Sequence, residues 1–379
     1  MIFFISKLTN HILRDIFNIN RCFIRYIFNI LLSILYLGFL VTGCTDVKDE
    51  KSEMENIKVN SNIDIEQLLI LSREATWTFP SSSGRPLPKI LPEWFARVSS
   101  ERNSFVKAVS NLLKTGNYDS AFEIAANVWR LWIIDGDDLG GSEFLNMTLK
   151  HISKVKQPHL QAMVLYGASL FDFRLGNIES SRKQSIAALN AALTGRNVEA
   201  ELLALLALSR VDLEEGNSKS AINHSLQSLQ LSKDFSPALG QSPLHILAQA
   251  TRLSGNLEEA SRLFQQSLKL NRQIGDKGMV IVELHNLGHV ELRLGHVNKA
   301  EELFKKLEEL GRGGDPYGTA MSLFNKASIA FVKGDLDTTE LLLKQARKTL
   351  HDANIIPATD DAAELDRLER QLKSIINEK

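Results

Sequence analysis

A glycine that recurs about every forty residues is the feature that most limits how this chain folds. Successive copies stand 40, 40, 39, 40 and 39 residues apart. The positions are Gly136, Gly176, Gly216, Gly255, Gly295 and Gly334. A fixed period of this length is typical of stacked helical hairpins, in which each repeat packs only on its neighbours. The sequence therefore predicts an array of similar units rather than a single-core domain.

The unit around Gly295 indicates why each repeat is a hairpin. Glycine just past a last helical turn takes the left-handed conformation that ends a helix. Apolar residues at three- and four-residue steps before and after it predict one buried face on each helix. The first stripe is Val280, Leu284, Leu287, Val290 and Leu294, and the second is Ala300, Leu303, Phe304, Leu307 and Leu310. Small residues at Gly288 and Ala300 allow the two helices to cross closely.

The same residues resemble the tetratricopeptide repeat. Leu287-Gly288, Gly295, Val297, Ala300 and Phe304 fit its pattern of Leu-Gly, turn glycine, alanine and large apolar residue. The resemblance implies an all-α, right-handed α-solenoid of helical hairpins, with a concave groove that binds proteins or peptides and with no enzymatic activity or cofactor. The period of about 40 exceeds the usual 34, so we expect a longer second helix or following loop.

The periodicity also predicts the organisation of the chain. Residues 63–117 are expected to hold N-terminal helices and a proline-rich loop, 118–350 the solenoid, and 351–379 a capping helix from Ala362 to Asn377. A polar outer face on the last helix is typical of such arrays. The six hairpins are expected at approximately 118–152, 160–193, 198–232, 238–272, 278–310 and 317–350.

Residues 1–43 have the pattern of an export signal, because Arg21 and Arg25 precede an uncharged run from Tyr26 to Val41. Val41-Thr42-Gly43-Cys44 resembles a bacterial lipobox. The resemblance implies a lipid on Cys44, which anchors the protein in the cell envelope, at the periplasmic face of the outer membrane in a Gram-negative organism. Two alternatives stay open. The run is long enough for an uncleaved membrane anchor, and ordinary cleavage would make Cys44 incidental.

The composition of residues 44–62 predicts a solvated tether, because charged side chains dominate and large apolar ones are nearly absent. The only cysteines are Cys22 and Cys44, so the repeats contain no disulfide, thiol nucleophile or cysteine metal site. The net charge is -1, and residues 1–43 contribute +3, so the remainder carries -4. A mildly acidic body argues against nucleic acid as a partner.

Residues 92–350 also resemble the repeat region behind the ATPase of large bacterial signal-transduction regulators. Trp94-Phe95 and Val128-Trp129-Arg130-Leu131-Trp132 carry this likeness most clearly. It implies an alternative function, a regulatory module that senses a ligand or a partner. The sequence has no phosphate-binding Gly-x-x-x-x-Gly-Lys-Ser/Thr loop and no helix-turn-helix motif.

The tetratricopeptide resemblance places first-helix side chains in the partner-binding groove. The candidates are Tyr166, Arg174, Arg210, Gln249, Arg252, His285, His289, Arg293, Asn325 and Lys333. A line of arginines fits an acidic partner or a C-terminal carboxylate, because guanidinium pairs bidentately with carboxylate.

Other residue clusters have weaker functional interpretations. His285, His289 and His296 have a spacing that can bind a metal, but Asn286 stands where a zinc-protease motif has glutamate, so groove-lining side chains are favoured. The acids around Gly136, at Asp135, Asp137 and Asp138, lack the calcium-loop pattern. Trp129, Trp132, Phe122 and Phe144 are expected in the core rather than in a ligand pocket. No catalytic triad is evident from local motifs.

Overall fold

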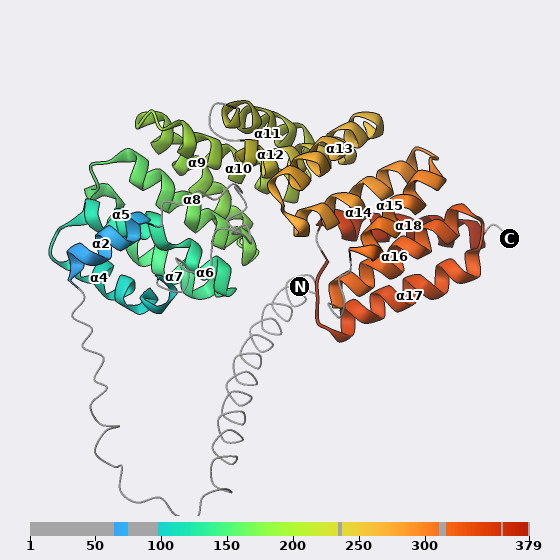
Figure 1. The fold of residues 1–379 in the computed structure, drawn as a ribbon, viewed down its shortest axis with the longest axis horizontal. Coiled ribbons are helices and arrows are strands. Elements are labelled where there is room, and N and C mark those ends of the chain that lie inside the picture. The colour runs from blue at the N-terminus through green and yellow to red at the C-terminus, as the bar shows by residue number, and fades with distance from the viewer. Residues whose placement is uncertain (1–63, 75–97, 234–236, 311–315, 358, 378–379) are drawn as a thin grey trace, which may run out of the picture. The chain divides into compact units, whose positions relative to one another are not determined.

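The computed structural model describes residues 64–74, 98–233, 237–310, 316–357 and 359–377 (Figure 1). The predicted signal at 1–43, the tether at 44–62 with Cys44, and most of the proline-rich loop lie outside these ranges. Every regular element within them is a helix, and none is a β-strand. Residues 62–379 belong to one compact unit.

Eighteen helical elements, two of them 3-10 helices, follow one another along the described residues. In order they are α2 (Ile65–Glu74), α4 (Arg102–Lys114), α5 (Tyr118–Val128), α6 (Arg130–Asp135), α7 (Asp138–Leu149), η1 (Ile152–Lys154), α8 (Pro158–Arg174), α9 (Ile178–Thr194), α10 (Val198–Glu214), α11 (Ser218–Ser232), η2 (Pro237–Gly240), α12 (Gln241–Leu253), α13 (Leu257–Ile274), α14 (Lys277–Arg293), α15 (Val297–Glu309), α16 (Pro316–Val332), α17 (Leu336–Asp352) and α18 (Thr359–Asn377).

Consecutive helices pack as antiparallel pairs, and each pair packs on the next (Figure 1). The pairs are α8 with α9, α10 with α11, α12 with α13, α14 with α15, and α16 with α17. The predicted all-α solenoid of tetratricopeptide-like hairpins is confirmed. The extra length per repeat is not confined to the second helix or loop, because α8 and α9 each have 17 residues.

Five of the six recurring glycines, Gly176, Gly216, Gly255, Gly295 and Gly334, lie at the turns inside the pairs. Gly216 and Gly295 have φ angles of 77° and 82°, the left-handed region that favours glycine. At the second of these turns the backbone N–H of His296 donates to the carbonyl of Glu291 at 2.8 Å, which satisfies a carbonyl of the last turn of α14. The periodic glycine is therefore a helix terminator, as the sequence indicated.

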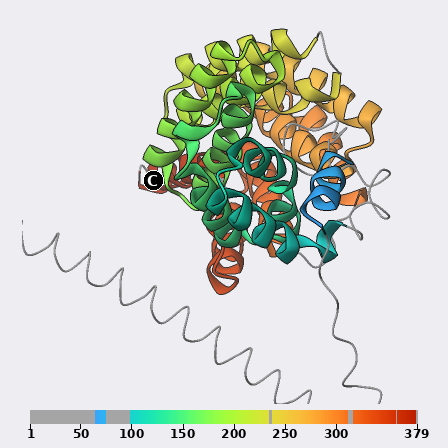
Figure 2. The ribbon, with the colours of Figure 1, turned by 90° about the vertical axis from the view of Figure 1, so that its left-hand side faces the viewer.

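The N-terminal part departs from the forty-residue register. Gly116, with φ 83°, joins α4 to α5, and Gly136 follows only 20 residues later between α6 and α7. The helix path is interrupted at Trp129, between α5 and α6. Helix α2 packs against α4 and α5 (Figure 2). The predicted hairpin at 118–152 therefore consists of three helices, α5, α6 and α7.

Buried carboxylates link one hairpin to the one before it. Asp212 on α10 accepts from Arg182 on α9 and lies 2.6 Å from His224 on α11. In the same way, Glu291 on α14 accepts from Ser261 on α13 at 2.6 Å. Burial opposes ionisation of Asp212, but hydrogen bonds from His224 and Arg182 outweigh it and lower its pKa. These contacts add polar specificity to an interface that is otherwise apolar.

Helices α14 and α15 approach closely because α14 carries Gly288. A Cβ at this position would stand 2.2 Å from Cε1 of Phe304 on α15, inside the van der Waals limit. Phe304 is buried in turn, with 7% of its surface exposed. The close crossing inferred for this glycine is therefore present in the structure.

We predict that Gly288→Ala lowers the free energy of unfolding by about 1–3 kcal/mol, the typical cost of overpacking a core. Gly278→Ala is the matched control on the same helix, because a Cβ there meets nothing closer than 3.4 Å. Since alanine favours helix more than glycine does, the control is expected to be neutral or slightly stabilising. Urea unfolding of both variants measures the difference, and equal stabilities would contradict the packing argument.

Helix α18 covers the open flank of the last pair. Leu365, Leu368 and Leu372 join a cluster that includes Phe324 of α16 and Leu343 of α17, and the three leucines are at most 4% exposed. Arg347 of α17 also forms ion pairs with Asp366 and Glu369 of α18. A helix therefore stands where the capping helix was predicted, and it begins three residues earlier, at Thr359.

Candidate functional site

Helix α14, the first helix of the α14–α15 hairpin, carries His285, His289 and Arg293 at four-residue spacing. This spacing places them on one helix face. That face is turned towards α16 and α18. The rings of His285 and His289 meet edge to face, with centroids 4.6 Å apart. We define these three residues as the α14 polar row.

His285 meets the first turn of α18. Its Nε2 lies 3.1 Å from Oδ1 of Asp361, and the hydroxyl of Tyr317 on α16 donates to the other carboxylate oxygen. Burial opposes the charge on Asp361, but the nearby His285 and the hydrogen bonds from His285 and Tyr317 outweigh it and keep its pKa below the usual range. Asp361 is therefore an ionised carboxylate held between two helices.

His289 is a buried neutral histidine. Its ring stacks on Phe324 with centroids 4.5 Å apart, and Nε2 lies 2.8 Å from Oδ1 of Asn325. Burial first, and the neighbouring His285 second, lower the pKa of His289 to about 3. The hydrogen bond and the ring contact account for this side chain without a ligand.

Arg293 completes the row. Its Nη1 lies 3.0 Å from Oε1 of Glu364 on α18, and Arg367 binds the other oxygen of Glu364 at 2.7 Å. Behind the row, Arg252 on α12 donates to Asn286 at 2.8 Å. Arg252 is only 1% exposed. The structure thus brings five of the predicted groove residues together, namely Arg252, His285, His289, Arg293 and Asn325.

Three other predicted groove residues, Tyr166, Arg174 and Arg210, stand apart from this cluster, whereas Gln249 lines a cavity together with His285. Tyr166 on α8 is buried edge-on against Trp129, with centroids 5.8 Å apart. Arg174 pairs with Asp138 at 2.7 Å. Arg210 on α10 is half-buried, and its Nη1 has no hydrogen-bond partner among the described residues. Partner binding by these side chains stays a prediction.

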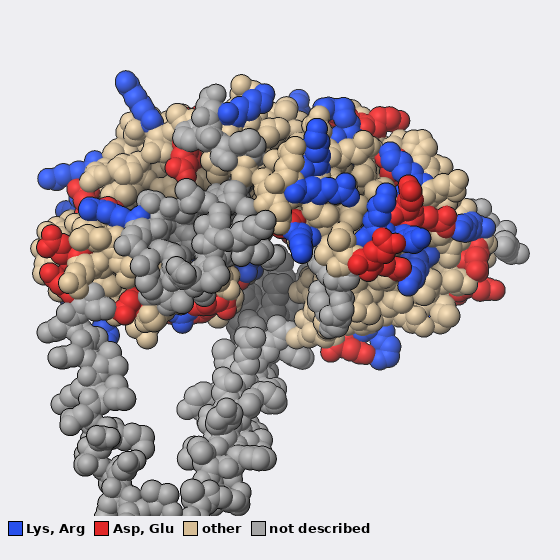
Figure 3. All heavy atoms as spheres, viewed as in Figure 1, with Lys and Arg blue, Asp and Glu red and all other residues tan. Residues whose placement is uncertain are grey.

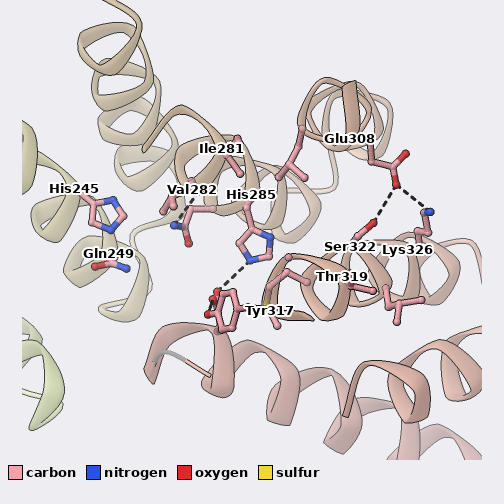
Figure 4. A pocket seen from close by; sticks show the side chains of 16 residues that line it. His245, Gln249, Ile281, Val282, His285, Glu308, Tyr317, Thr319, Ser322 and Lys326 are labelled. Carbon is pink, nitrogen blue, oxygen red and sulfur yellow. Dashed lines mark hydrogen bonds and ion pairs between the residues drawn. The ribbon is translucent and has the colours of Figure 1, made fainter. Parts of the chain in front are cut away.

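A cavity of about 580 Å³ opens beside the α14 polar row, between α12, α14, α15, α16 and the start of α18 (Figure 4). Its walls are mainly apolar, and His285 and Asp361 form part of its polar side. The apolar lining is Ile281, Val282, Leu307, Met321 and Leu323. On another side, Glu308 pairs with Lys326 at 3.0 Å and accepts from Ser322 at 3.2 Å. The arrangement suits an apolar group with an adjacent polar one.

Most cavity residues were not among the sequence candidates, which included only Gln249 and His285. A signal for two of them was present. Ile281 and Val282 lie outside the stripe of Val280, Leu284 and Leu287, and both remain partly exposed. Large apolar residues beside the packing stripe of a first helix could have indicated a binding surface.

The weaker sequence candidates have structural roles. Trp129, Trp132, Phe122 and Phe144 all lie in the core, as predicted. Asp137 accepts from the backbone N–H of Gly140 as a helix cap, while Asp135 pairs with Arg102 at 2.9 Å. Within the described ranges, no group of three or more His, Cys, Asp or Glu side chains is placed to hold a metal ion.

Charge is mixed on the visible surface of the C-terminal helices. Lysine and arginine side chains are interspersed with aspartate and glutamate in Figure 3. Among the helices of the described ranges, none combines the length and the apolar character needed to cross a bilayer.

Comparison with known proteins agrees with this architecture. The tetratricopeptide-repeat family model matches residues 242–312, which cover α12 from its second residue and all of α13 to α15. A search of curated proteins finds no match to the chain.

Solved tetratricopeptide-type structures share the fold at low sequence identity. A Rap protein complexed with competence and sporulation factor has a TM-score of 0.50 and 15% identity, over 66% of this chain and 77% of that one. NprR in complex with its cognate peptide NprX has a TM-score of 0.51 and 14% identity, over 78% and 87%.

A signal-transduction ATPase with a tetratricopeptide-repeat sensor, from Pyrococcus horikoshii, has a TM-score of 0.52 and 16% identity. The match covers 74% of this chain and 46% of that protein. The two resemblances found in the sequence, to tetratricopeptide repeats and to the repeat region of these regulators, are thus confirmed at the level of fold.

The neutral state of His289 predicts a pH-dependent stability. Because its folded pKa of about 3 lies below the ordinary value of 6.5, the unfolded chain binds a proton first on acidification. The stabilising effect is complete above pH 6.5 and is lost as the pH falls towards 3, by at most about 1.4 kcal/mol per pH unit from this group. Urea unfolding from pH 7 to 4 measures the slope.

The matched comparison is between His289→Gln and His351→Gln. Gln keeps a donor near Asn325 but does not titrate, so the first variant is expected to lose this part of the slope. The side chain of His351 is 90% exposed, and its replacement is expected to leave the slope unchanged. An identical slope in the His289 variant and the wild type would show that the histidine is not held neutral.

Proposed function

We propose that this protein is a non-catalytic docking protein whose tetratricopeptide repeats bind a protein or peptide partner. The observation that carries the proposal is the apolar-walled cavity between the first helices α14 and α16, beside the α14 polar row. Partly exposed apolar residues and a few convergent polar groups are typical of a recognition site. Two proteins of similar fold were solved with a partner bound, NprR with its cognate peptide and a Rap protein with competence and sporulation factor, which is consistent with this role.

We further propose that the partner is met at the bacterial cell envelope. The support is the lipobox-like sequence ending in Cys44, after a basic and then apolar leader. Lipid on Cys44 would anchor the chain firmly, because several acyl chains together hold a protein at a bilayer. The charged tether at 44–62 would then separate the repeats from the membrane surface.

A second candidate is a regulatory module that senses a ligand or partner. The observation in its favour is the similar fold of the ATPase with a tetratricopeptide-repeat sensor. The two candidates differ in compartment, since a module acting on a cytosolic ATPase needs no lipid anchor. Processing at Cys44 therefore discriminates between them.

Peptide binding is tested at the cavity wall. We predict that peptides selected from a displayed random library on the full chain lose at least tenfold in affinity on Ile281→Arg, because a charge would enter the apolar wall. Leu341→Arg is the matched control, since Leu341 on α17 is 56% exposed and lies outside the cavity. Fluorescence anisotropy measures both. If no selected peptide depends on Ile281 for binding, the proposed docking function is wrong.

The envelope assignment is tested by mass spectrometry of the N-terminal peptide from membrane-extracted protein. We predict a diacylated or triacylated Cys44 as the first residue, and loss of both lipid and processing in Cys44→Ala. An unprocessed N-terminus in the wild-type chain would instead favour the sensing module.

A further inference from the structure

The inward face of α18 carries two buried acids as well as its leucines. Leu365, Leu368 and Leu372 suffice to cover the last hairpin, yet Asp361 and Glu364 are also buried, at 8% and 4% exposure. Acids are among the least expected residues in such positions. Their presence on the packing face therefore calls for an explanation beyond capping.

Both acids reach past the last hairpin to α14. Asp361 lies against His285 and accepts from Tyr317, while Glu364 pairs with Arg293. His285 and Arg293 belong to the first-helix side chains that the sequence indicated for an acidic partner. The chain thus supplies carboxylates of its own to that surface.

These polar contacts contribute little to holding α18 in place. Removing charges from water offsets most of the Coulombic gain of a buried ion pair, so an apolar replacement is often equally stable. The leucines account for the attachment of the helix, through burial of apolar surface. A carboxylate held in this way is exchangeable for another carboxylate at small net cost.

The cavity lies next to the carboxylate of Asp361, the group that another carboxylate could replace. His285 and Asp361 line it together with Ile281, Val282 and Met321. Figure 4 shows His285 close to Ile281 and Val282. His285 is 6% exposed, and its Nδ1 is buried with no hydrogen-bond partner among the described residues. A partner that enters this site would therefore meet three features: apolar walls, the unpaired Nδ1 of His285, and the place between His285 and Tyr317 that the carboxylate of Asp361 occupies.

We propose that the first turn of α18 is an internal ligand. Asp361 occupies the position between His285 and Tyr317 that a partner's carboxylate takes when it binds, and an apolar side chain next to that carboxylate fills the cavity. The partner is a peptide segment that carries an acidic side chain and a large apolar residue. This inference rests on the proposed docking function. It adds that α18 competes with the partner for the same place on α14 and α16.

Only the first turn has to move. Leu365, Leu368 and Leu372 follow Asp361, and Arg347 of α17 binds Glu369 at 2.8 Å further along the helix. Helix ends open locally at a lower free energy than the rest of a fold. Displacement of Asp361 therefore leaves the cap on α16 and α17 intact.

The experiment uses the full chain and a fluorescein-labelled synthetic peptide with the sequence of residues 355–366, which carries Ile355, Ile356 and Asp361. Asp361→Asn in the chain weakens the internal competitor, so we expect the peptide to bind this variant at least ten times more tightly than the wild type. Asp366→Asn is the matched control. Asp366 lies on the same helix but pairs with Arg347 of α17 rather than with α14, and wild-type affinity is expected.

Two further arms test the position itself. In the Asp361→Asn chain, a labelled peptide with asparagine at its own position 361 is expected to lose at least tenfold in affinity. It lacks the carboxylate that takes the place of Asp361, while Asp360, Glu364 and Asp366 are present in both peptides. Tyr317→Phe, which removes only the hydroxyl donor, is expected to weaken binding of the native peptide. Circular dichroism confirms that each variant is folded.

Equal binding to the wild-type and Asp361→Asn chains, or no binding to either, would overturn the inference. So would binding that does not depend on the peptide's aspartate. Library-selected peptides separate this failure from failure of the docking function. If they need Ile281 but bind both chains equally, docking stands and competition by α18 is wrong. If no peptide needs Ile281, docking itself fails.

Discussion

The apolar flank that each hairpin leaves open governs the construction of this chain, because no hairpin buries its own core. Leu247 of α12, Phe264 of α13 and Leu284 of α14 lie in one cluster, so a single core is shared by two successive pairs. A unit with this property is stable only beside another unit. The array must therefore continue until an element with one apolar and one polar face ends it, and α18 is that element.

Two helices of a pair must approach closely, and successive pairs must be held together in one register. The sequence meets these two requirements with different residue types. Gly288 lets α15 contact the backbone of α14 through Phe304. Asp212 and Glu291 connect a hairpin to its predecessor through side chains of α9 and α13. Apolar burial supplies the stability, while the carboxylates favour one register over others because an unpaired buried charge is costly.

The sequence predicted what depends on local spacing and missed what depends on distant contacts. The turns at Gly216 and Gly295 follow from glycine conformation, and the buried faces follow from apolar steps along each helix. The three-helix segment around Trp129 escaped the forty-residue count because Gly116 and Gly136 are only 20 residues apart. The contact of Asp361 with His285 spans 76 residues, and no local pattern encodes a partner so far along the chain.

The first helices of such an array present a concave row of side chains, and the last helix necessarily comes next to that row because it occupies the place of a further first helix. A cap with only apolar residues would close the array and leave Nε2 of His285 without this hydrogen-bond partner and Arg293 without this counter-charge. Asp361 supplies the first contact and Glu364 the second. The same geometry that completes the fold therefore brings a carboxylate of the chain to the surface proposed for its partner. Ending the array and occupying the proposed binding surface are thus consequences of one helix, acting through different residues.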